Sequence, residues 1–312
     1  MVFEHTPVLP EEVFLHQNLK PGDVAVDGTL GGCGHALRTI EAILPDGLLI
    51  GIDQDRDAID NARDVLRPYK DNVLLVHDNF SNLSRILKAN HIEAVNSILV
   101  DLGFSLHQIE KSKRGFSFNK EEPLDMRMDI RHTRTAADII HSLKEKELAD
   151  LFYHYGEERF SRRIARRIVA QRQNNPISTS KDLAAIVAAA VPTPRGKRHK
   201  IHPATQVFQA LRIAVNRELD VLKAFMAQIP DVLKKDGRVS IISFHSLEDR
   251  IVKQSIRNYE QGCTCPKGLP QCICGFEPRM KAVFKKPVIA KEAELETNPM
   301  ARSAKLRVAK RV

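Results

Sequence analysis

The feature that most constrains the fold is an alternation of short aliphatic runs and helical stretches over the first hundred residues. Each run is bounded by Gly, Asp or Asn, as is typical of parallel strands that are buried on both faces. The four runs are residues 24–26, 48–52, 73–76 and 97–100. Candidate helices lie between them, for example at 57–66 and 81–89. Repeated strand–helix units predict an α/β fold built on a doubly wound sheet.

This alternation stops near residue 110. The next eighty residues contain almost no strand signal, only helical patterns at 144–155, 157–171 and 180–190. A strand pattern returns at 238–244 and is followed by a helix, after which two late runs, at 282–290 and 304–312, could form an antiparallel pair. We therefore predict one α/β domain, residues 1–109 and 203–312, interrupted by an all-helical insertion, residues 110–202.

Positive charge is segregated along the chain. The net charge is +9, yet residues 110–202 alone hold 20 Lys and Arg against 12 Asp and Glu. The last twelve residues add five basic side chains and no acid. Segregated positive charge is typical of proteins that bind a polyanion, but it also serves general solubility, and charge alone favours neither.

Composition narrows the class of protein. Hydrophobic residues make up 43% of the 312-residue chain, which is normal for a globular protein and too high for a largely disordered one. No apolar run approaches the length that crosses a bilayer, and residues 1–12 lack the basic-then-apolar pattern of a signal peptide. We expect a cytoplasmic protein without a membrane partner.

A glycine-rich loop follows the first predicted strand and precedes a helix. It reads Val26-Asp-Gly-Thr-Leu-Gly-Gly-Cys-Gly-His35, and its glycines allow a tight turn and close approach of a ligand. The third glycine of a dinucleotide-binding loop is missing, and Asp27 would repel a pyrophosphate. The same carboxylate would attract the ammonium of a methionine moiety. The loop therefore favours S-adenosylmethionine over NAD, and a turn without a ligand is a minor alternative.

Three further strand ends carry candidate site residues. Asp53 can accept hydrogen bonds from both hydroxyls of a ribose, although a solvated Asp is common at such a position. Phe80 could cover an adenine, and is equally consistent with a core residue. Asp101 ends the fourth strand, near the group to be transferred, where a carboxylate can hold the hydrogens of a target amine. A cofactor-contacting or strand-capping Asp101 is an equal alternative.

The chain resembles a known family in segments that run in order over nearly its whole length. It is similar to the MraW (RsmH) family of bacterial small-subunit ribosomal RNA methyltransferases. The matching segments are His5-Thr-Pro-Val-Leu9, Asp27-Gly-Thr-Leu-Gly31 with Gly34-His35, Asp101-Leu-Gly103, Arg114-Gly-Phe-Ser-Phe118, Pro123-Leu-Asp-Met-Arg-Met-Asp129, Tyr155-Gly-Glu-Glu-Arg-Phe160, His202-Pro-Ala-Thr205 with Phe208-Gln-Ala210, Ser243-Phe-His-Ser-Leu-Glu-Asp-Arg250, and Asn298-Pro299 with Ala301-Arg-Ser303.

The resemblance implies an activity and a set of site residues. The family methylates N4 of a cytidine in the decoding region of 16S rRNA, using a class I methyltransferase domain with a helical insertion. The expected partner is 16S rRNA within the 30S subunit or a late assembly particle, although naked rRNA stays possible. By motif position, the cofactor site would include Asp27, Gly31, Cys33, Gly34, His35, Asp53, Phe80, Asp101 and Gln108.

One segment departs from the family pattern. After Asp101-Leu-Gly103 the family usually reads Val-Ser-Ser-Pro-Gln, whereas this chain reads Phe104-Ser-Leu-His-Gln108. Ser105 and Gln108 are retained, and Ser105 stays a candidate for the reaction together with Asp101. The second serine is absent, so no substrate role can be carried over for it.

The insertion contains two basic clusters that suit RNA. Arg159, Arg162, Arg163 and Arg166 share one face of a predicted helix, while Phe160, Ile164 and Ile168 form a packing face. A solvated face paired with Glu157 and Glu158 is the alternative. The second cluster is Arg195, Lys197, Arg198 and Lys200. Outside the insertion, His245 follows the fifth strand, where it could face the target base or bond the next turn.

The cysteines late in the chain form two Cys-x-Cys pairs. Four thiolates can hold a tetrahedral zinc, but this spacing is less specific than Cys-x-x-Cys. The spacing therefore leaves open whether the cluster binds a metal. If it binds a structural zinc, the ligands would be Cys263, Cys265, Cys272 and Cys274.

Other functions remain open at this stage. A methyltransferase with another RNA amine as substrate would share the same loop and strand-end acids, whereas the basic insertion disfavours a small-molecule substrate. A non-catalytic RNA-binding assembly factor that kept the fold is disfavoured by Asp27, Asp53 and Asp101.

Overall fold

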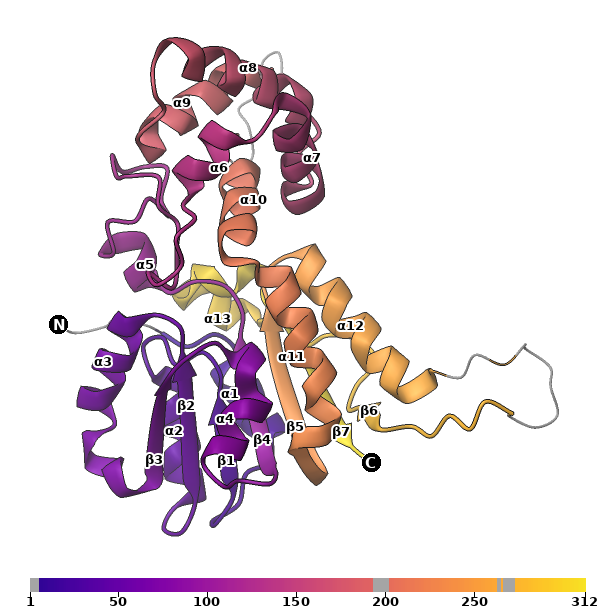
Figure 1. The fold of residues 1–312 in the computed structure, drawn as a ribbon. Helices are drawn as coiled ribbons and strands as arrows, with labels where there is room; N and C mark the ends of the chain where they lie inside the picture. The colour runs from indigo at the N-terminus through magenta and orange to yellow at the C-terminus, as the bar shows by residue number, and fades with distance from the viewer. Residues whose placement is uncertain (1–5, 193–201, 263–264, 266–272) are drawn as a thin grey trace. The chain divides into compact units, whose positions relative to one another are not determined.

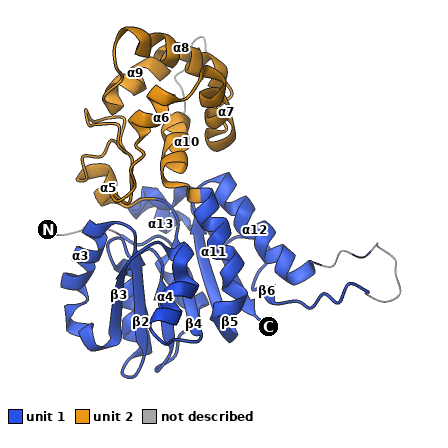
Figure 2. Cartoon of the chain, viewed as in Figure 1, with its two compact units in different colours: residues 1–103, 219–312 blue, residues 104–218 orange. Residues whose placement is uncertain are grey.

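The computed structural model describes residues 6–192, 202–262, 265 and 273–312. The chain forms two compact units: residues 1–103 with 219–312, and residues 104–218 (Figure 2). Both boundaries of the second unit lie outside the predicted 110–202. The C-terminal boundary is later because helix α10 (Thr205–Asn216) packs against α7 (Glu145–Gly156) and so belongs to the helical unit.

The first unit is built on a seven-stranded sheet with the order β3-β2-β1-β4-β5-β7-β6. Neighbours among β1 to β5 run parallel, and β7 runs antiparallel to both β5 and β6. The strand order reverses between β1 and β4, so the predicted doubly wound sheet is confirmed. The predicted late strand at 304–312 is β7, whereas of the predicted run at 282–290 only Ala282 belongs to a strand, β6, and Val288 forms a single bridge to Leu306. The strands are β1 (Val24–Asp27), β2 (Leu48–Asp53), β3 (Val73–His77), β4 (Val95–Asp101), β5 (Leu233–Ser243), β6 (Met280–Ala282) and β7 (Lys305–Arg311).

Helices cover both faces of this sheet (Figure 1). Ile98 and Val100 share a buried cluster with one set of helices, whereas Leu99 between them belongs to a cluster on the opposite face. Strand residues are buried on both sides, which explains their continuous aliphatic runs. The first set is α4 (Leu83–Ala89), α11 (Glu218–Val232) and α12 (Ser246–Gln261); the second is α1 (Pro10–Gln17), α2 (Gly34–Ile43) and α3 (Arg56–Val65).

Residues 6–7 and Asn298, which are far apart in the sequence, lie together beside the glycine loop. A Cβ at Gly34 would lie 2.9 Å from Cδ of Pro7, so only glycine lets this segment approach so closely. Asn298 lies between α13 (Glu292–Thr297) and the short helix η3 (Pro299–Ser303), and its Nδ2 lies 3.4 Å from the carbonyl oxygens of both Thr6 and Pro7. Segments at opposite ends of the sequence therefore support one loop.

The second unit is helical around its own apolar core, which includes Phe152, Ile164 and Leu211. A loop before α6 is held by buried polar groups: Arg114 donates to the carbonyls of Arg127 and Met128, and Asn216 bonds the main chain of residues 126 and 128. The helices are α5 (Leu106–Glu110), α6 (Ala136–Ser142), α7, α8 (Ser161–Asn174), α9 (Ser180–Ala190) and α10.

The predicted helix at 157–171 begins later than expected. Helix α7 ends at Gly156, and Glu157 adopts a left-handed conformation with φ of 52°. The buried carboxylate of Glu158 accepts a hydrogen bond from the N–H of Phe160, and α8 starts at Ser161.

In the described parts of the chain, no helix combines the length and apolar character needed to cross a bilayer.

Replacing Gly156 with alanine should separate α7 from α10. A Cβ at this position would lie 2.4 Å from the carbonyl oxygen of Gln206 and would meet main chain that cannot move aside freely. We expect the substitution to lower the free energy of unfolding by about 1–3 kcal/mol, a typical cost of overpacking. Urea unfolding of the full chain measures this, and an unchanged midpoint would contradict the described contact.

Candidate active site

Three carboxylates end neighbouring strands at one edge of the sheet. Asp27, Asp53 and Asp101 are the last residues of β1, β2 and β4, which lie side by side in the sheet. This edge is formed by the carboxyl ends of parallel strands at the point where the strand order reverses, and open α/β sheets bind their ligands there. The structure therefore brings together the three acids that the sequence singled out.

The glycine loop is hydrogen-bonded to all three strand ends. Asp27 Oδ1 accepts from the N–H of Thr29 at 3.1 Å, and Asp53 Oδ2 accepts from the N–H of Gly31 at 3.0 Å. The hydroxyl oxygen of Thr29 accepts from the N–H of Asp101 at 2.7 Å. These bonds fix the loop against the sheet before any ligand binds. Thr29 was not a predicted site residue, because a hydroxyl inside a glycine loop has no distinctive spacing.

Burial sets the protonation of the three acids. It raises the pKa of Asp27 to about 7 and that of Asp53 to about 6. For Asp101, burial raises the pKa well above its ordinary value, and the carboxylates of Asp27 and Glu248 raise it further. Among the described residues, no lysine or arginine pairs with these acids. Such a site attracts a cation or a hydrogen-bond donor, because either one stabilises the ionised carboxylates.

Asp101 has an unused acceptor. Its Oδ1 is shielded from solvent and has no hydrogen-bond partner within the described parts of the chain. Its main chain is held by the hydroxyl of Thr29 and by the pairing of β4 with β5, in which Leu102 donates to the carbonyl of Ile242. A buried acceptor without a partner costs free energy, so a ligand that donates a hydrogen bond to it would be stabilised.

The loop residues Cys33 and His35 are buried beside α2. The Cys33 side chain is fully buried in an apolar cluster with Ala25 and Ala36, and burial raises the pKa of its thiol to about 12. Any contact between Cys33 and a cofactor must therefore use its main chain. His35 lies in the first turn of α2 and is 8% exposed. Gly34 packs against Pro7, which supplies a structural reason for this glycine.

Phe80 lies in the core below the loop. Its ring meets that of Phe225 edge-on, with centroids 5.2 Å apart, and the residue is only 8% exposed. It shares a buried cluster with residues of β4 and α11. This placement favours the core alternative over a ring that lies against an adenine.

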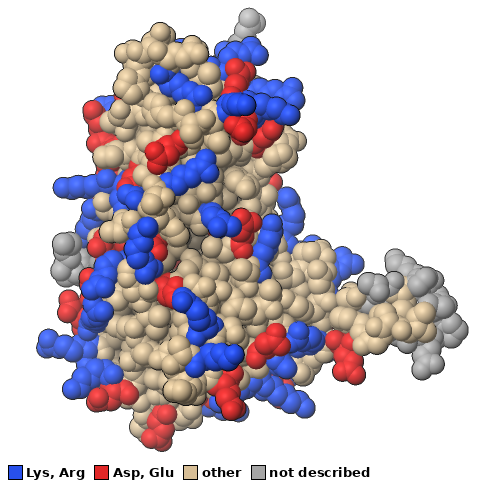
Figure 3. All heavy atoms as spheres, viewed as in Figure 1, with Lys and Arg blue, Asp and Glu red and all other residues tan. Residues whose placement is uncertain are grey.

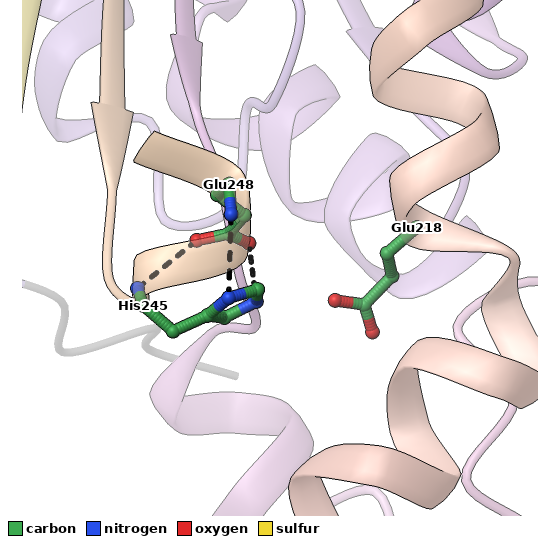
Figure 4. Close-up of side chains that lie close together, drawn as sticks. All are labelled: Glu218, His245 and Glu248. Atoms are coloured by element: carbon green, nitrogen blue, oxygen red, sulfur yellow. Dashed lines mark hydrogen bonds and ion pairs between the residues drawn. The ribbon is translucent and has the colours of Figure 1, made fainter. Parts of the chain in front are cut away.

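His245 caps the helix that follows β5. Its Nδ1 accepts from the N–H of Glu248, and its Nε2 lies 3.1 Å from Glu248 Oε1 (Figure 4). Glu248 Oε2 in turn accepts from the N–H groups of Phe244 and His245. The structure thus supports the alternative in which His245 bonds the next turn. Figure 4 also draws Glu218, which belongs to the other compact unit.

Glu248 is a site residue that the sequence analysis missed. It is 2% exposed, and its charge raises the pKa of Asp101. The signal was present as a capping box, His245-x-x-Glu248, directly after a strand. A capping pattern predicts the start of a helix, however, and does not reveal which strand end the acid will face.

Two further residues that the sequence predicted at the active site, Ser105 and Gln108, lie in the second unit. Ser105 and Gln108 form a capping box on α5: Ser105 Oγ accepts from the N–H of Gln108, and Gln108 Oε1 accepts from the N–H of Ser105. Gln108 is buried at 6% exposure. Their predicted roles at the cofactor and the target base stay predictions.

Three of the four arginines of the predicted basic face lie on α8. Arg162, Arg163 and Arg166 are exposed there, while Ile164 and Ile168 are fully buried as predicted. Arg159 precedes the helix, and its guanidinium lies 4.6 Å from the ring centroid of Phe160. On the face drawn in Figure 3, basic side chains are interspersed with acidic ones. The second cluster, Arg195, Lys197, Arg198 and Lys200, lies outside the described residues.

The basic end of the chain is a strand, and much of its charge is paired. Within β7, Arg307 and Lys305 pair with Asp249, and Lys310 pairs with Asp236 at 2.7 Å. These charges therefore support the sheet and are not a separate basic arm.

Of the four clustered cysteines, the structure describes Cys265 and Cys274, whereas Cys263 and Cys272 fall outside the described residues. The zinc hypothesis is therefore untested.

Replacing Asp27 with asparagine should stabilise the ligand-free protein at alkaline pH. Folded Asp27 holds a proton up to about pH 7 and the unfolded chain releases it near pH 3.8, so this group lowers stability as pH rises between those values. Asparagine keeps the acceptor for Thr29 and carries no charge. We expect a higher urea midpoint than wild type at pH 8, and a smaller difference at pH 5.

Asp60→Asn provides the matched control for that measurement. Asp60 is exposed on α3 and pairs with Arg56 and Arg63. Its replacement should not raise the midpoint at pH 8. Equal behaviour of the two variants would contradict the buried charge at Asp27.

The chain is similar to known proteins over its whole length. A model of the MraW methylase family matches residues 2–312. A protein of Desulforapulum autotrophicum named ribosomal RNA small subunit methyltransferase H is 56% identical over 312 residues, covering 100% of both chains. A protein of Geotalea uraniireducens with the same name is 49% identical over 311 residues, covering 99% of each. A methylase family fits the predicted cofactor, S-adenosylmethionine, and these matches show that the chain belongs to the MraW methylase family.

Proposed function

We propose that this protein transfers a methyl group from S-adenosylmethionine to N4 of a cytidine in the decoding region of 16S rRNA. The observation that carries the proposal is the buried, unpaired Oδ1 of Asp101 beside two more carboxylates at the sheet switch point. Membership of a methylase family supports methyl transfer. The names of the relatives point to small-subunit ribosomal RNA as the substrate.

The cofactor would be held by the loop and strand ends of the first unit. S-adenosylmethionine supplies an electrophilic methyl group on a sulfonium, and its sulfonium and ammonium charges match a site with three uncompensated carboxylates. Asp27 would balance the ammonium, and Asp53 would accept from the ribose hydroxyls. Gly31, Gly34 and the main chain of Cys33 would line the loop. His35, Phe80 and Gln108 complete the proposed set, with Phe80 supporting the loop from the core.

Asp101 would act on the target amine. The lone pair of a cytosine N4 is delocalised into the ring, so it must be freed and aimed at the methyl carbon. A carboxylate that accepts the hydrogens of the amine orients it and stabilises the positive charge that develops on nitrogen. As the N–C bond forms, the S–C bond breaks and one N4 proton is lost. Asp101, whose pKa burial raises, is suited to receive that proton.

The second unit would bind the RNA. It carries 22 Lys and Arg against 13 Asp and Glu, which equals the entire +9 net charge, while the first unit holds 26 of each. Positive charge confined to one unit favours a contact with phosphates. The substrate would be 16S rRNA within the 30S subunit or a late assembly particle. In structured RNA the target base must be exposed or flipped out of its stack.

Labelled methyl transfer tests the proposed reaction. Full-length protein is incubated with labelled S-adenosylmethionine and with 30S subunits or 16S rRNA that lack the modification, and the product nucleosides are separated by mass. We expect label in N4-methylcytidine. Label in a different nucleoside would keep the methyltransferase and overturn the proposed target. Cofactor binding without label on either substrate would favour the non-catalytic assembly factor.

The role of Asp101 is tested by Asp101→Asn. This change keeps an oxygen acceptor but removes the negative charge that stabilises the developing cation. We expect kcat to fall by about a hundredfold or more, as is typical when one electrostatic stabiliser is lost, while the dissociation constant of S-adenosylmethionine changes less. An unchanged kcat with much weaker cofactor binding would instead make Asp101 a cofactor ligand.

The arginines of α8 are tested by the salt dependence of RNA binding. Each lost phosphate contact lowers the slope of log K against log salt by about 0.7–0.9, so Arg162→Ala with Arg163→Ala should lower it by about 1–2. The matched control is Arg56→Ala with Arg63→Ala on α3 of the neutral unit, which should leave the slope unchanged. Equal slopes for both double variants would remove α8 from the RNA contact.

A further inference from the structure

Three aromatic rings lie in contact in the second unit, and the outermost of them, that of His202, belongs to an exposed residue. The imidazole of His202 lies parallel to the ring of Phe118, with centroids 4.5 Å apart and an angle of 14° between the planes. Phe118 meets Phe208 edge-on at 5.5 Å. Phe208 belongs to α10 and is 5% exposed, so these rings are anchored in the core of this unit.

The exposed ring of His202 is also held in one orientation. Its Nδ1 accepts a hydrogen bond from the N–H of Ala204 at 3.2 Å, and its carbonyl accepts from the N–H of Thr205 at 3.0 Å. An accepting Nδ1 places the proton of the neutral ring on Nε2. Phe118 covers one face of the imidazole, so its exposure comes from the other face and from the edges.

A fixed, exposed aromatic face is suited to stacking against another flat ring. Its orientation is set in advance, so a ligand that stacks on it loses little free energy in ordering the protein. Proteins that bind single-stranded RNA use such rings as platforms for unstacked bases. The Nε2–H group at the edge of the ring is a donor that a base or phosphate oxygen could accept.

The charge of this unit favours RNA over a protein partner. All of the net positive charge of the chain belongs to residues 104–218. A stacking ring in a basic context combines the two contacts that bind single-stranded RNA, namely base stacking and phosphate pairing.

We propose that the exposed face of His202, backed by Phe118, is a stacking site for an unpaired base of the RNA. This inference rests on the proposed RNA substrate, and it adds a base contact within the second unit to the phosphate contacts of the arginines.

The test measures RNA binding without methyl transfer. The probe is a single-stranded RNA that contains 2-aminopurine, whose fluorescence is quenched when the base stacks, and affinity for 16S rRNA is measured in parallel. We expect His202→Ala to weaken binding by about tenfold and to abolish the quenching, because stacking of a base on an aromatic ring is a main contribution to the binding of single strands. His202→Phe should restore both, since it keeps a flat ring.

Two controls separate stacking from a structural role. His154 is another exposed histidine of this unit, on α7, and His154→Ala should bind the probe as wild type does. The urea midpoint of His202→Phe should be close to that of wild type, because this variant keeps a ring against Phe118. Wild-type quenching by His202→Ala would overturn the proposal, as would failure of His202→Phe to restore binding.

The outcome is independent of the assigned target. If wild-type protein transfers no methyl group to 16S rRNA but quenches the probe through His202, the proposed function fails and the stacking site stands. If methyl transfer to N4 of cytidine occurs and the His202 variants all bind equally, the function stands and the stacking site is wrong.

Discussion

The hydrogen bonds between the glycine loop and three strand ends are the constraint on which the site depends. Asp27 accepts from the N–H of Thr29, Asp53 accepts from that of Gly31, and the hydroxyl of Thr29 accepts from the N–H of Asp101, so one short loop is tied to the three strand ends that carry the carboxylates. Burying these acids without a cation is unfavourable, and their raised pKa values, caused chiefly by burial, express that cost. The surrounding structure overcomes it: Pro7 and Asn298 support the loop from opposite ends of the chain. The site is therefore organised for a positively charged ligand at the expense of stability.

The two compact units differ in net charge. The first unit has as many basic as acidic residues, and three of its acids end strands at the switch point, whereas the second carries the whole net positive charge. The net attraction of a polyanion therefore comes from the helical unit. This separation lets one chain bind a cationic cofactor and an anionic substrate without one interfering with the other.

The sheet and the three strand-end acids could be predicted from the sequence, whereas the features that it did not reveal depend on tertiary packing. The parallel strands were found because burial on both faces leaves continuous aliphatic runs, and Asp27, Asp53 and Asp101 were found because those strands end in acids. The compact helical unit extends beyond the predicted insertion, because the amphipathic pattern of α10 does not say which core it packs against. Motif position also does not separate side chain from main chain: the Cys33 thiol and the Phe80 ring lie in the core, and the predicted roles of these two residues at a cofactor stay predictions. Glu248 was missed because its neighbourhood is set by tertiary packing.

The place of β7 in the sheet affects the order in which the two units can fold during synthesis. It lies between β5 and β6 in the sheet, although it is the last of the seven strands along the chain. Its Arg307 and Lys305 also pair with Asp249, one residue from the Glu248 that acts on Asp101. The helical unit is continuous in sequence and can fold as soon as residue 218 is available, whereas the seven-stranded sheet needs every residue up to Arg311 of β7. A nascent chain would thus acquire the proposed RNA-binding unit well before the strand ends that carry the three carboxylates are supported by a complete sheet.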